Sequence, residues 1–145
     1  MSAIRFMDAT QNDVEAIVDC ISAAYAKARE TIDDLPDVTA GIAQEIADHH
    51  VLLARIGERL VGVVIFARKN TAMKVINLAV SPKTQGQGIA AQLLAKVEDV
   101  AKDCDCSHME LRTHRLMLDT RAIYSHLGWV QTEVDANSVA MRKDL

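Results

Sequence analysis

The stretch Thr84–Leu94, TQGQGIAAQLL, connects an apolar run that ends at Val80 to a segment with the apolar spacing of an amphipathic helix. It contains two glycines, Gly86 and Gly88, and a glycine costs conformational entropy unless a turn or a close contact requires it. The first N–H groups of a helix have no partner inside the helix, and the helix dipole favours an anion beside them. This pattern therefore predicts that a phosphate group of a ligand binds at the turn.

Apolar spacing on both sides of the turn predicts a mixed chain of strands and helices. Strands are predicted over residues 3–7, 51–57, 58–69, 73–80, 107–113, 129–134 and 138–143. Helices are predicted over about residues 11–30, 39–48, 89–103 and 118–127. We expect residues 51–80 to form an antiparallel meander whose last strand is central and buried on both faces. Strand 107–113 follows a helix and should lie parallel to that central strand. The predicted fold class is α/β (α+β): one domain over residues 1–145, with a mixed, mainly antiparallel central sheet and flanking helices.

Short local signals mark the ends of these helices. Thr10 with Asp13 three residues later resembles a capping box at the start of the first helix. Thr39 is expected to cap the second helix, and His49–His50 to end it. Gly128 has the position of a C-terminal cap after the last helix.

Composition favours an ordinary globular protein and excludes several classes. Half of the residues are apolar, a quarter are charged and the net charge is -4. The lysines and arginines are scattered, and two Phe, two Tyr and one Trp are too few for a base-stacking platform, so we expect no nucleic-acid partner. No apolar run approaches the roughly 20 residues that span a bilayer, and the first residues lack the features of a signal peptide. Three cysteines fit a reducing compartment, so we expect a cytoplasmic protein without a membrane partner.

Two kinds of phosphate site fit the glycine turn. The stretch GQGIAA, Gly86–Ala91, matches the dinucleotide fingerprint G-x-G-x-x-A. Five residues separate Val80 from Gly86, however, whereas a dinucleotide turn follows its strand almost directly. No acidic residue closes the next strand to bind a ribose hydroxyl either. A nicotinamide dinucleotide-binding protein therefore stays a less favoured alternative, and a Walker loop is excluded because no Gly-Lys-Ser/Thr follows.

A second pattern covers the same letters. Gln85–Ala90 reads Q-x-x-G-x-A directly after the strand NLAVSP, and Tyr124–Trp129 reads Y-x-x-L-G-W. In this order the two patterns are specific, and over nearly its whole length the chain resembles the GCN5-related N-acetyltransferase (GNAT) family. The resemblance implies a GNAT-like acyl-CoA acyltransferase fold, acetyl-CoA as cosubstrate and no metal. It further implies transfer of the acetyl group to a primary amine of a small molecule, peptide or protein, and a possible homodimer.

The resemblance also assigns site residues. The turn of Gln85, Gly86, Gln87, Gly88, Ile89 and Ala90 is expected to hold the diphosphate of acetyl-CoA. The strand of Leu78, Ala79 and Val80 is expected to bind the pantetheine arm, with the backbone of Leu78 and Val80 pairing as an added strand would. Tyr124 has the place of the family's general acid, which donates a proton to the sulfur of coenzyme A after direct attack by the amine.

Two positions depart from the family's pattern. Lys74 stands where some members have a glutamate base, and Met117 stands where many have an asparagine. His114 has a suitable intrinsic pKa for a base and follows a predicted strand, whereas Glu110 is a poorer candidate. A chain of waters that carries the amine proton away is an equal alternative. A noncatalytic acyl-CoA-binding or regulatory module of the same fold therefore stays open.

Other chemical side chains have simpler interpretations. Asp33, Asp34 and Asp37 lie in an acidic segment between the first two helices, where a solvated loop or attraction of a cationic amine would account for them. Cys104, Cys106 and His108 lack a fourth ligand, so we expect no metal site. Cys20 is expected in or near the core.

Overall fold

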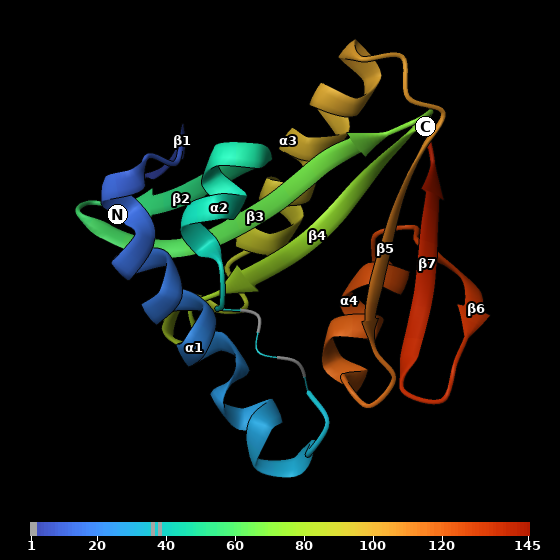
Figure 1. Ribbon diagram of the computed structural model, residues 1–145, viewed down its shortest axis with the longest axis horizontal. Helices are drawn as coiled ribbons and strands as arrows, with labels where there is room; N and C mark the ends of the chain where they lie inside the picture. Colours follow the sequence, from blue (N-terminus) through green and yellow to red (C-terminus); the bar gives the residue numbers. More distant parts are fainter. Residues whose placement is uncertain (1–2, 36, 38) are drawn as a thin grey trace.

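The computed structural model describes residues 3–35, 37 and 39–145. In these residues seven strands form one sheet in the order β1-β2-β3-β4-β5-β7-β6 (Figure 1). The strands are β1 (Ile4–Asp8), β2 (His50–Ile56), β3 (Arg59–Lys69), β4 (Ala72–Val80), β5 (His108–His114), β6 (Val130–Val134) and β7 (Ser138–Asp144). The described α-helices are α1 (Val14–Thr31), α2 (Ile42–Asp48), α3 (Ile89–Asp103) and α4 (Leu118–His126). Among the described strands only the β4–β5 pair is parallel, so the predicted mixed, mainly antiparallel sheet with flanking helices is confirmed.

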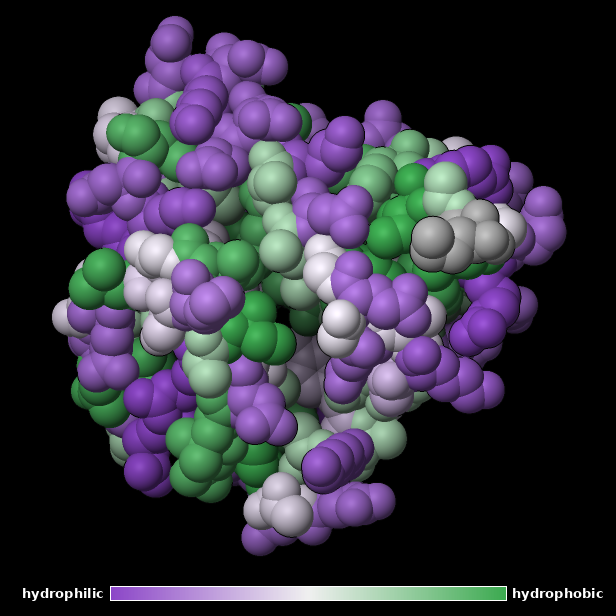
Figure 2. All heavy atoms as spheres, turned by 180° about the vertical axis from the view of Figure 1, so that it is seen from behind, coloured by the Kyte–Doolittle hydropathy of each residue, from purple (hydrophilic) through white to green (hydrophobic). Residues whose placement is uncertain are grey.

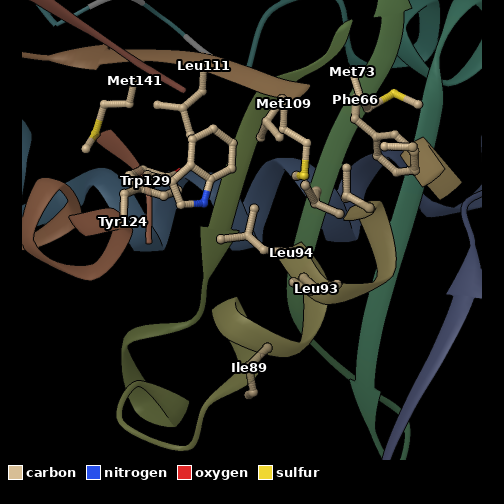
Figure 3. Packing of buried hydrophobic residues seen from close by; sticks show 14 of the residues in the cluster. Phe66, Met73, Ile89, Leu93, Leu94, Met109, Leu111, Tyr124, Trp129 and Met141 are labelled. Carbon is tan, nitrogen blue, oxygen red and sulfur yellow. The ribbon is translucent and has the colours of Figure 1, made fainter. Parts of the chain in front are cut away.

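Helices cover both faces of the sheet and bury two apolar clusters. The cluster beneath α1 and α2 includes Ile17, Cys20, Ile21, Ile42, Leu53 and Val63. The cluster beneath α3 and α4 includes Phe66, Met73, Leu93, Met109 and Tyr124 (Figure 3). The predicted core position of Cys20 is therefore confirmed, and its burial raises the pKa of the thiol to about 11. No helix in the described residues is long and apolar enough to cross a bilayer.

The central strands β4 and β5 separate after a short stretch of pairing. Their parallel ladder includes only Ala72 to Val75 of β4. Beyond Val75, β4 stays with β3 while β5 stays with β7. A register shift between Ile65 and Phe66 of β3 leaves Ile76 of β4 as the extra residue of a bulge, and bulges bend strands. Figure 1 shows the two strands diverging, and Figure 2 shows a hollow near the middle of the opposite view where they part.

The bulge also corrects the expectation that the central strand is buried on both faces. The strand is central, but Ile76 is 38% exposed and Lys74 is only half-buried. Lys74 is the next-to-last residue of β4 that pairs with β5, and Ile76 is the first residue beyond this ladder, so the strand is not fully covered where the two strands separate.

The start of α2 differs from its prediction. Gly41 is the N-cap, with φ +73°, and the hydroxyl of Thr39 instead donates to Oδ1 of Asp37 at 2.6 Å. At the other end, His49 follows the helix as predicted, whereas His50 is already the first residue of β2. The start differs because a glycine takes the cap position while the hydroxyl of Thr39 bonds to a local carboxylate. His50 belongs to β2 because it pairs with Phe66 of β3.

Two other terminal signals are confirmed. The N–H of Thr10 donates to Oδ2 of Asp13 at 2.8 Å, which forms the expected capping box, although a 3-10 turn, Gln11–Asp13, precedes α1. Gly128 follows α4 with φ +96°, and its N–H donates to the carbonyl of Ser125 at 3.1 Å.

Candidate functional site

The separation of β4 from β5 leaves one backbone edge of β4 open. The N–H of Ser81 donates to the carbonyl of Val61 on β3 at 2.8 Å. Backbone groups of alternate strand residues point to the same side, so those of Ala79 also turn toward β3, and those of Leu78 and Val80 turn toward the gap. This edge offers donors and acceptors to an extended ligand that lies between the strands.

The open edge leads into the glycine turn before α3. Gly86 and Gly88 have φ values of +84° and +76°, which favour glycine, and an added Cβ on Gly86 would meet no atom within 4 Å. At this end of α3 the N–H of Gln92 donates to the carbonyl of Gly88 at 3.1 Å. The N–H groups of Ile89, Ala90 and Ala91 come before that first bond and have no acceptor within the helix. The turn therefore presents open backbone and a helix N-terminus, which is a chemical fit for a diphosphate.

Tyr124 lies inside the protein beside this gap. Its side chain is 5% exposed, and its ring lies 5.6 Å from that of Trp129 (Figure 3). Burial raises the pKa of Tyr124 far above its usual value, and the charge of Tyr25 raises it further. The hydroxyl therefore stays protonated and can act as a proton donor.

Tyr25 and Asn77 form a polar contact that the sequence analysis did not identify. The hydroxyl of Tyr25 on α1 donates to Oδ1 of Asn77 on β4 at 3.3 Å. Asn77 is 9% exposed, and burial raises the pKa of Tyr25. Tyr25 also raises the pKa of Tyr124, so the two hydroxyls are close enough to interact electrostatically. A lone asparagine in an apolar strand was the available signal, since a buried amide requires a partner.

His114 at the end of β5 is held on both sides of its ring. Its Nδ1 accepts the N–H of Leu116 at 3.1 Å, so the proton of the neutral ring is on Nε2, which donates to Oδ1 of Asp34 at 2.6 Å. Asn137 donates to the other carboxylate oxygen at 3.5 Å. These hydrogen bonds, that from His114 first, lower the pKa of Asp34. This three-residue clasp of His114, Asp34 and Asn137 connects the loop after α1 to β5 and to the turn before β7.

The remaining predicted residues are distributed around the gap. Lys74 pairs in register with Glu110 of β5, and Oε2 of Glu110 lies 3.4 Å from Nε2 of His108. Met117 is the residue that precedes α4. Hydrogen bonds from Thr39 lower the pKa of Asp37, which is therefore engaged within its own loop.

The cysteines and histidine near residue 106 form no larger cluster. Cys104, Cys106 and Cys20 are free thiols. Across residues 3–35, 37 and 39–145, no three His, Cys, Asp or Glu side chains come together in a way that could hold a metal ion.

Comparison of the sequence with known protein families gives one match, and it covers most of the chain. The model of the acetyltransferase (GNAT) family matches residues 15–129. None of the curated proteins compared with the chain shows significant similarity to it.

Comparison of the structure identifies solved proteins with the same fold. The PaiA N-acetyltransferase of Thermoplasma acidophilum, solved in complex with coenzyme A, has a TM-score of 0.88 at 16% identity and covers 99% of both chains. The ribosomal-protein-S18-alanine N-acetyltransferase of Escherichia coli has a TM-score of 0.81 at 14% identity, with 98% of this chain and 94% of that chain covered. A GNAT-family acetyltransferase of Staphylococcus aureus Mu50 has a TM-score of 0.81 at 19% identity, with 99% of each chain covered. At these identities the likeness establishes the fold.

Proposed function

The chain belongs to the acetyltransferase (GNAT) family, and from this premise we propose that it transfers an acetyl group from acetyl-CoA to a primary amine. One observation carries the proposal: the open edge of β4 leads directly into a glycine turn and the free N-terminus of α3. An acyl-CoA needs such a path, because its pantetheine arm is extended and polar and its diphosphate is anionic. A neighbour of the same fold has been solved with coenzyme A, which supports the assignment.

Backbone groups of this chain would hold the cosubstrate. We assign the diphosphate to the turn from Gln85 to Ala90, and the pantetheine arm to the strand from Leu78 to Val80. Leu78 and Val80 supply the backbone groups that face the gap. When bound, acetyl-CoA supplies an acetyl group activated as a thioester. The N–H of Leu78 is our candidate for polarising the thioester carbonyl.

Tyr124 is our candidate for the general acid. Its hydroxyl stays neutral because it is buried, and a neutral phenol can donate a proton to the departing sulfur. Tyr25 and Asn77 would then fix the polar surroundings of this hydroxyl from α1 and β4.

The base for the acceptor amine is a separate question. A lysine-like amine has a pKa of about 10.4, so only about one molecule in a thousand is unprotonated at pH 7. His114 remains a predicted base, but both of its ring nitrogens are engaged while the clasp with Asp34 is closed. We therefore propose that the amine loses its proton to water, and that His114 mainly holds the loop after α1. Catalysis would then depend largely on positioning.

A free-thiol release assay tests the function. Purified protein and acetyl-CoA would be mixed with polyamines, amino acids, aminoglycosides and lysine peptides in turn. Release above background hydrolysis with one acceptor class would establish an acetyltransferase and identify the class. Thermal shift with acetyl-CoA and with NAD provides the control, because a ligand that binds only the folded state raises the unfolding temperature. Stabilisation by acetyl-CoA without any turnover would favour the noncatalytic module, and stabilisation by NAD alone would refute the proposal.

A further inference from the structure

An open cavity of about 580 Å³ lies beside the point where β4 and β5 begin to separate. Its walls include His49, the residue after α2, together with Lys74 and Ile76 on β4 and Arg112 on β5. Lys74 lies between Met73 and Val75, which both pack into the cluster beneath α3. Because strand side chains alternate between faces, Lys74 points to the opposite face, which α1 and α2 cover. The cavity is therefore on the face opposite α3.

The lining of this cavity is cationic although the chain as a whole has a net charge of -4. Arg68, Lys69, Lys74 and Arg112 all border it, and no Asp or Glu is present among the described lining residues. Arg68 is the register partner of Met73, which packs beneath α3, so its side chain points to that face, and its Nε donates to the carbonyl of Asn70 at 3.0 Å. Lys69 pairs with Ala72 and shares the face of Lys74. Within the described chain, Arg68, Lys69 and Lys74 form no ion pair. Positive charge gathered in a concave site of an acidic protein favours an anionic ligand.

Nearby carboxylates reduce this charge without cancelling it. Arg112 is held by Glu133 at 3.1 Å and Asp135 at 3.0 Å. Glu110 is the register partner of Lys74 and shares its face of the sheet, but it forms no ion pair with Lys74, and its Oε2 lies 3.4 Å from Nε2 of His108. The cations of β3 and β4 thus keep their charge available to the cavity.

The position of the cavity relates it to the site around Asn77. Lys74 precedes Asn77 by three residues on the same strand, about 10 Å at 3.3 Å per residue. In the same direction along β5, His114 and its partner Asp34 lie four residues beyond Glu110. The gap between the strands therefore has cations at one end and a carboxylate at the other. An acceptor with an amine at one end and an anionic group at the other would fit this polarity.

We infer that the cavity whose free cations are Lys69 and Lys74 binds a carboxylate or phosphate group of the amine acceptor. The inference rests on the proposed acetyltransferase function. It restricts the acceptor to amines that carry an anionic group several bonds from the reacting nitrogen. Lys74 is then a specificity residue at a position where some relatives are expected to have a glutamate.

The test has a binding experiment that does not need turnover. Acetate and inorganic phosphate would be titrated separately into the protein, and the backbone amide signals of residues 67–76 followed by NMR. We expect one or both anions to shift these signals, and the shifts to be lost in Lys69→Gln/Lys74→Gln. Lys102→Gln, which removes an exposed cation at the end of α3, is the matched control and should behave as wild type. The anion that binds more tightly distinguishes a carboxylate site from a phosphate site. Absence of shifts in the wild type, or equal shifts in the double variant, would overturn the inference whatever the activity.

The second experiment measures turnover with matched acceptors. Hexylamine, 6-aminohexanoate and O-phosphoethanolamine would be compared in the thiol release assay. A hydrogen bond to a charged group strengthens binding, so we expect kcat/KM for an anionic acceptor to exceed that for hexylamine by about tenfold or more. Lys69→Gln/Lys74→Gln should remove this preference by raising the acceptor KM and leave the acetyl-CoA KM unchanged. Equal use of charged and uncharged amines by the wild type would contradict the inference. Lack of turnover with every amine would refute the proposed function. The NMR titration would still show whether the cavity binds an anion.

Discussion

Nε2 of His114 lies 2.6 Å from Oδ1 of Asp34, although 80 residues separate the two in the sequence. Asp34 belongs to the loop that follows α1, and His114 is the last residue of β5. The contact therefore fixes this loop beside the gap between β4 and β5. A single buried imidazole connects the proposed acceptor side to the strand that borders the cosubstrate path.

The clasp predicts how stability depends on pH. Hydrogen bonds lower the pKa of Asp34 in the folded protein, so the clasp is fully formed above the ordinary aspartate pKa of about 3.9. Its contribution is lost as the pH falls through the lower folded value. Asp34→Asn should therefore reduce the free energy of unfolding at pH 7 and pH 5, and the difference from wild type should shrink below about pH 4. Urea unfolding at several pH values measures this.

The neighbouring carboxylate provides the control for that experiment. Asp33 is exposed and has no hydrogen bond or ion pair within the described chain, so Asp33→Asn should change stability little at any pH. If the free energy of unfolding of Asp34→Asn stays below that of wild type by a constant amount down to pH 3, the carboxylate charge is not the cause of the lost stability.

Tyr124→Phe tests the proposed general acid. General acid catalysis contributes roughly 10²–10⁴ to rates, so we expect kcat to fall by at least about a hundredfold. The affinity for acetyl-CoA should change little, because backbone groups are assigned to hold it. Burial raises the pKa of Tyr124, so wild-type activity should show no alkaline loss from this hydroxyl below about pH 10. Steady-state kinetics across this pH range measures both effects. Unchanged kcat in Tyr124→Phe would show that the hydroxyl is not the general acid and that Tyr124 contributes only to packing.

The sequence predicted those features that depend on local or periodic signals. Helix ends at Thr10 and Gly128 followed from cap chemistry, and the parallel β4–β5 pair followed from the rule for strands joined by a helix. The contact of His114 with Asp34 could not be predicted, because no local pattern places residues that far apart in sequence next to one another. The bulge at Ile76 was missed for a related reason, since only pairing with β3 reveals it.

Gly88→Arg tests the cosubstrate site. The positive φ at Gly88 makes any other residue cost about 1–2 kcal/mol, and an arginine side chain there would occupy the space before the α3 N-terminus. We expect loss of acetyl-CoA binding by calorimetry. Gly57→Arg is the matched control, because Gly57 has a similar φ of +60° in the turn between β2 and β3. It should lose similar stability and keep acetyl-CoA affinity. Equal acetyl-CoA affinity in both variants would contradict the assignment of the diphosphate to this turn.

Gly62→Ala tests how closely α3 approaches the sheet. A Cβ at Gly62 would stand 3.0 Å from both Cγ2 of Ile89 and Cδ1 of Leu93. We expect the variant to lose about 1–3 kcal/mol of stability, because the helix must shift away from β3. The cost should be smaller in a Leu93→Val background, which lacks the δ methyl groups. Chemical denaturation of the four proteins of this cycle measures the coupling, and strictly additive costs would contradict the contact.

Tyr25→Phe and Asn77→Leu test the polar contact between α1 and β4. Removing the hydroxyl leaves the buried Oδ1 of Asn77 without its donor, so Tyr25→Phe should cost about 1–3 kcal/mol. Asn77→Leu should cost a similar amount, because the partly buried hydroxyl of Tyr25 then lacks its acceptor. The double variant should cost less than the sum of the single changes, since replacing both partners by apolar groups leaves neither unsatisfied. Urea unfolding gives the three energies. If Tyr25 acts only on stability, kcat corrected for folded fraction will not change; a lower kcat with an unchanged acetyl-CoA KM would make it a positioning residue for Tyr124.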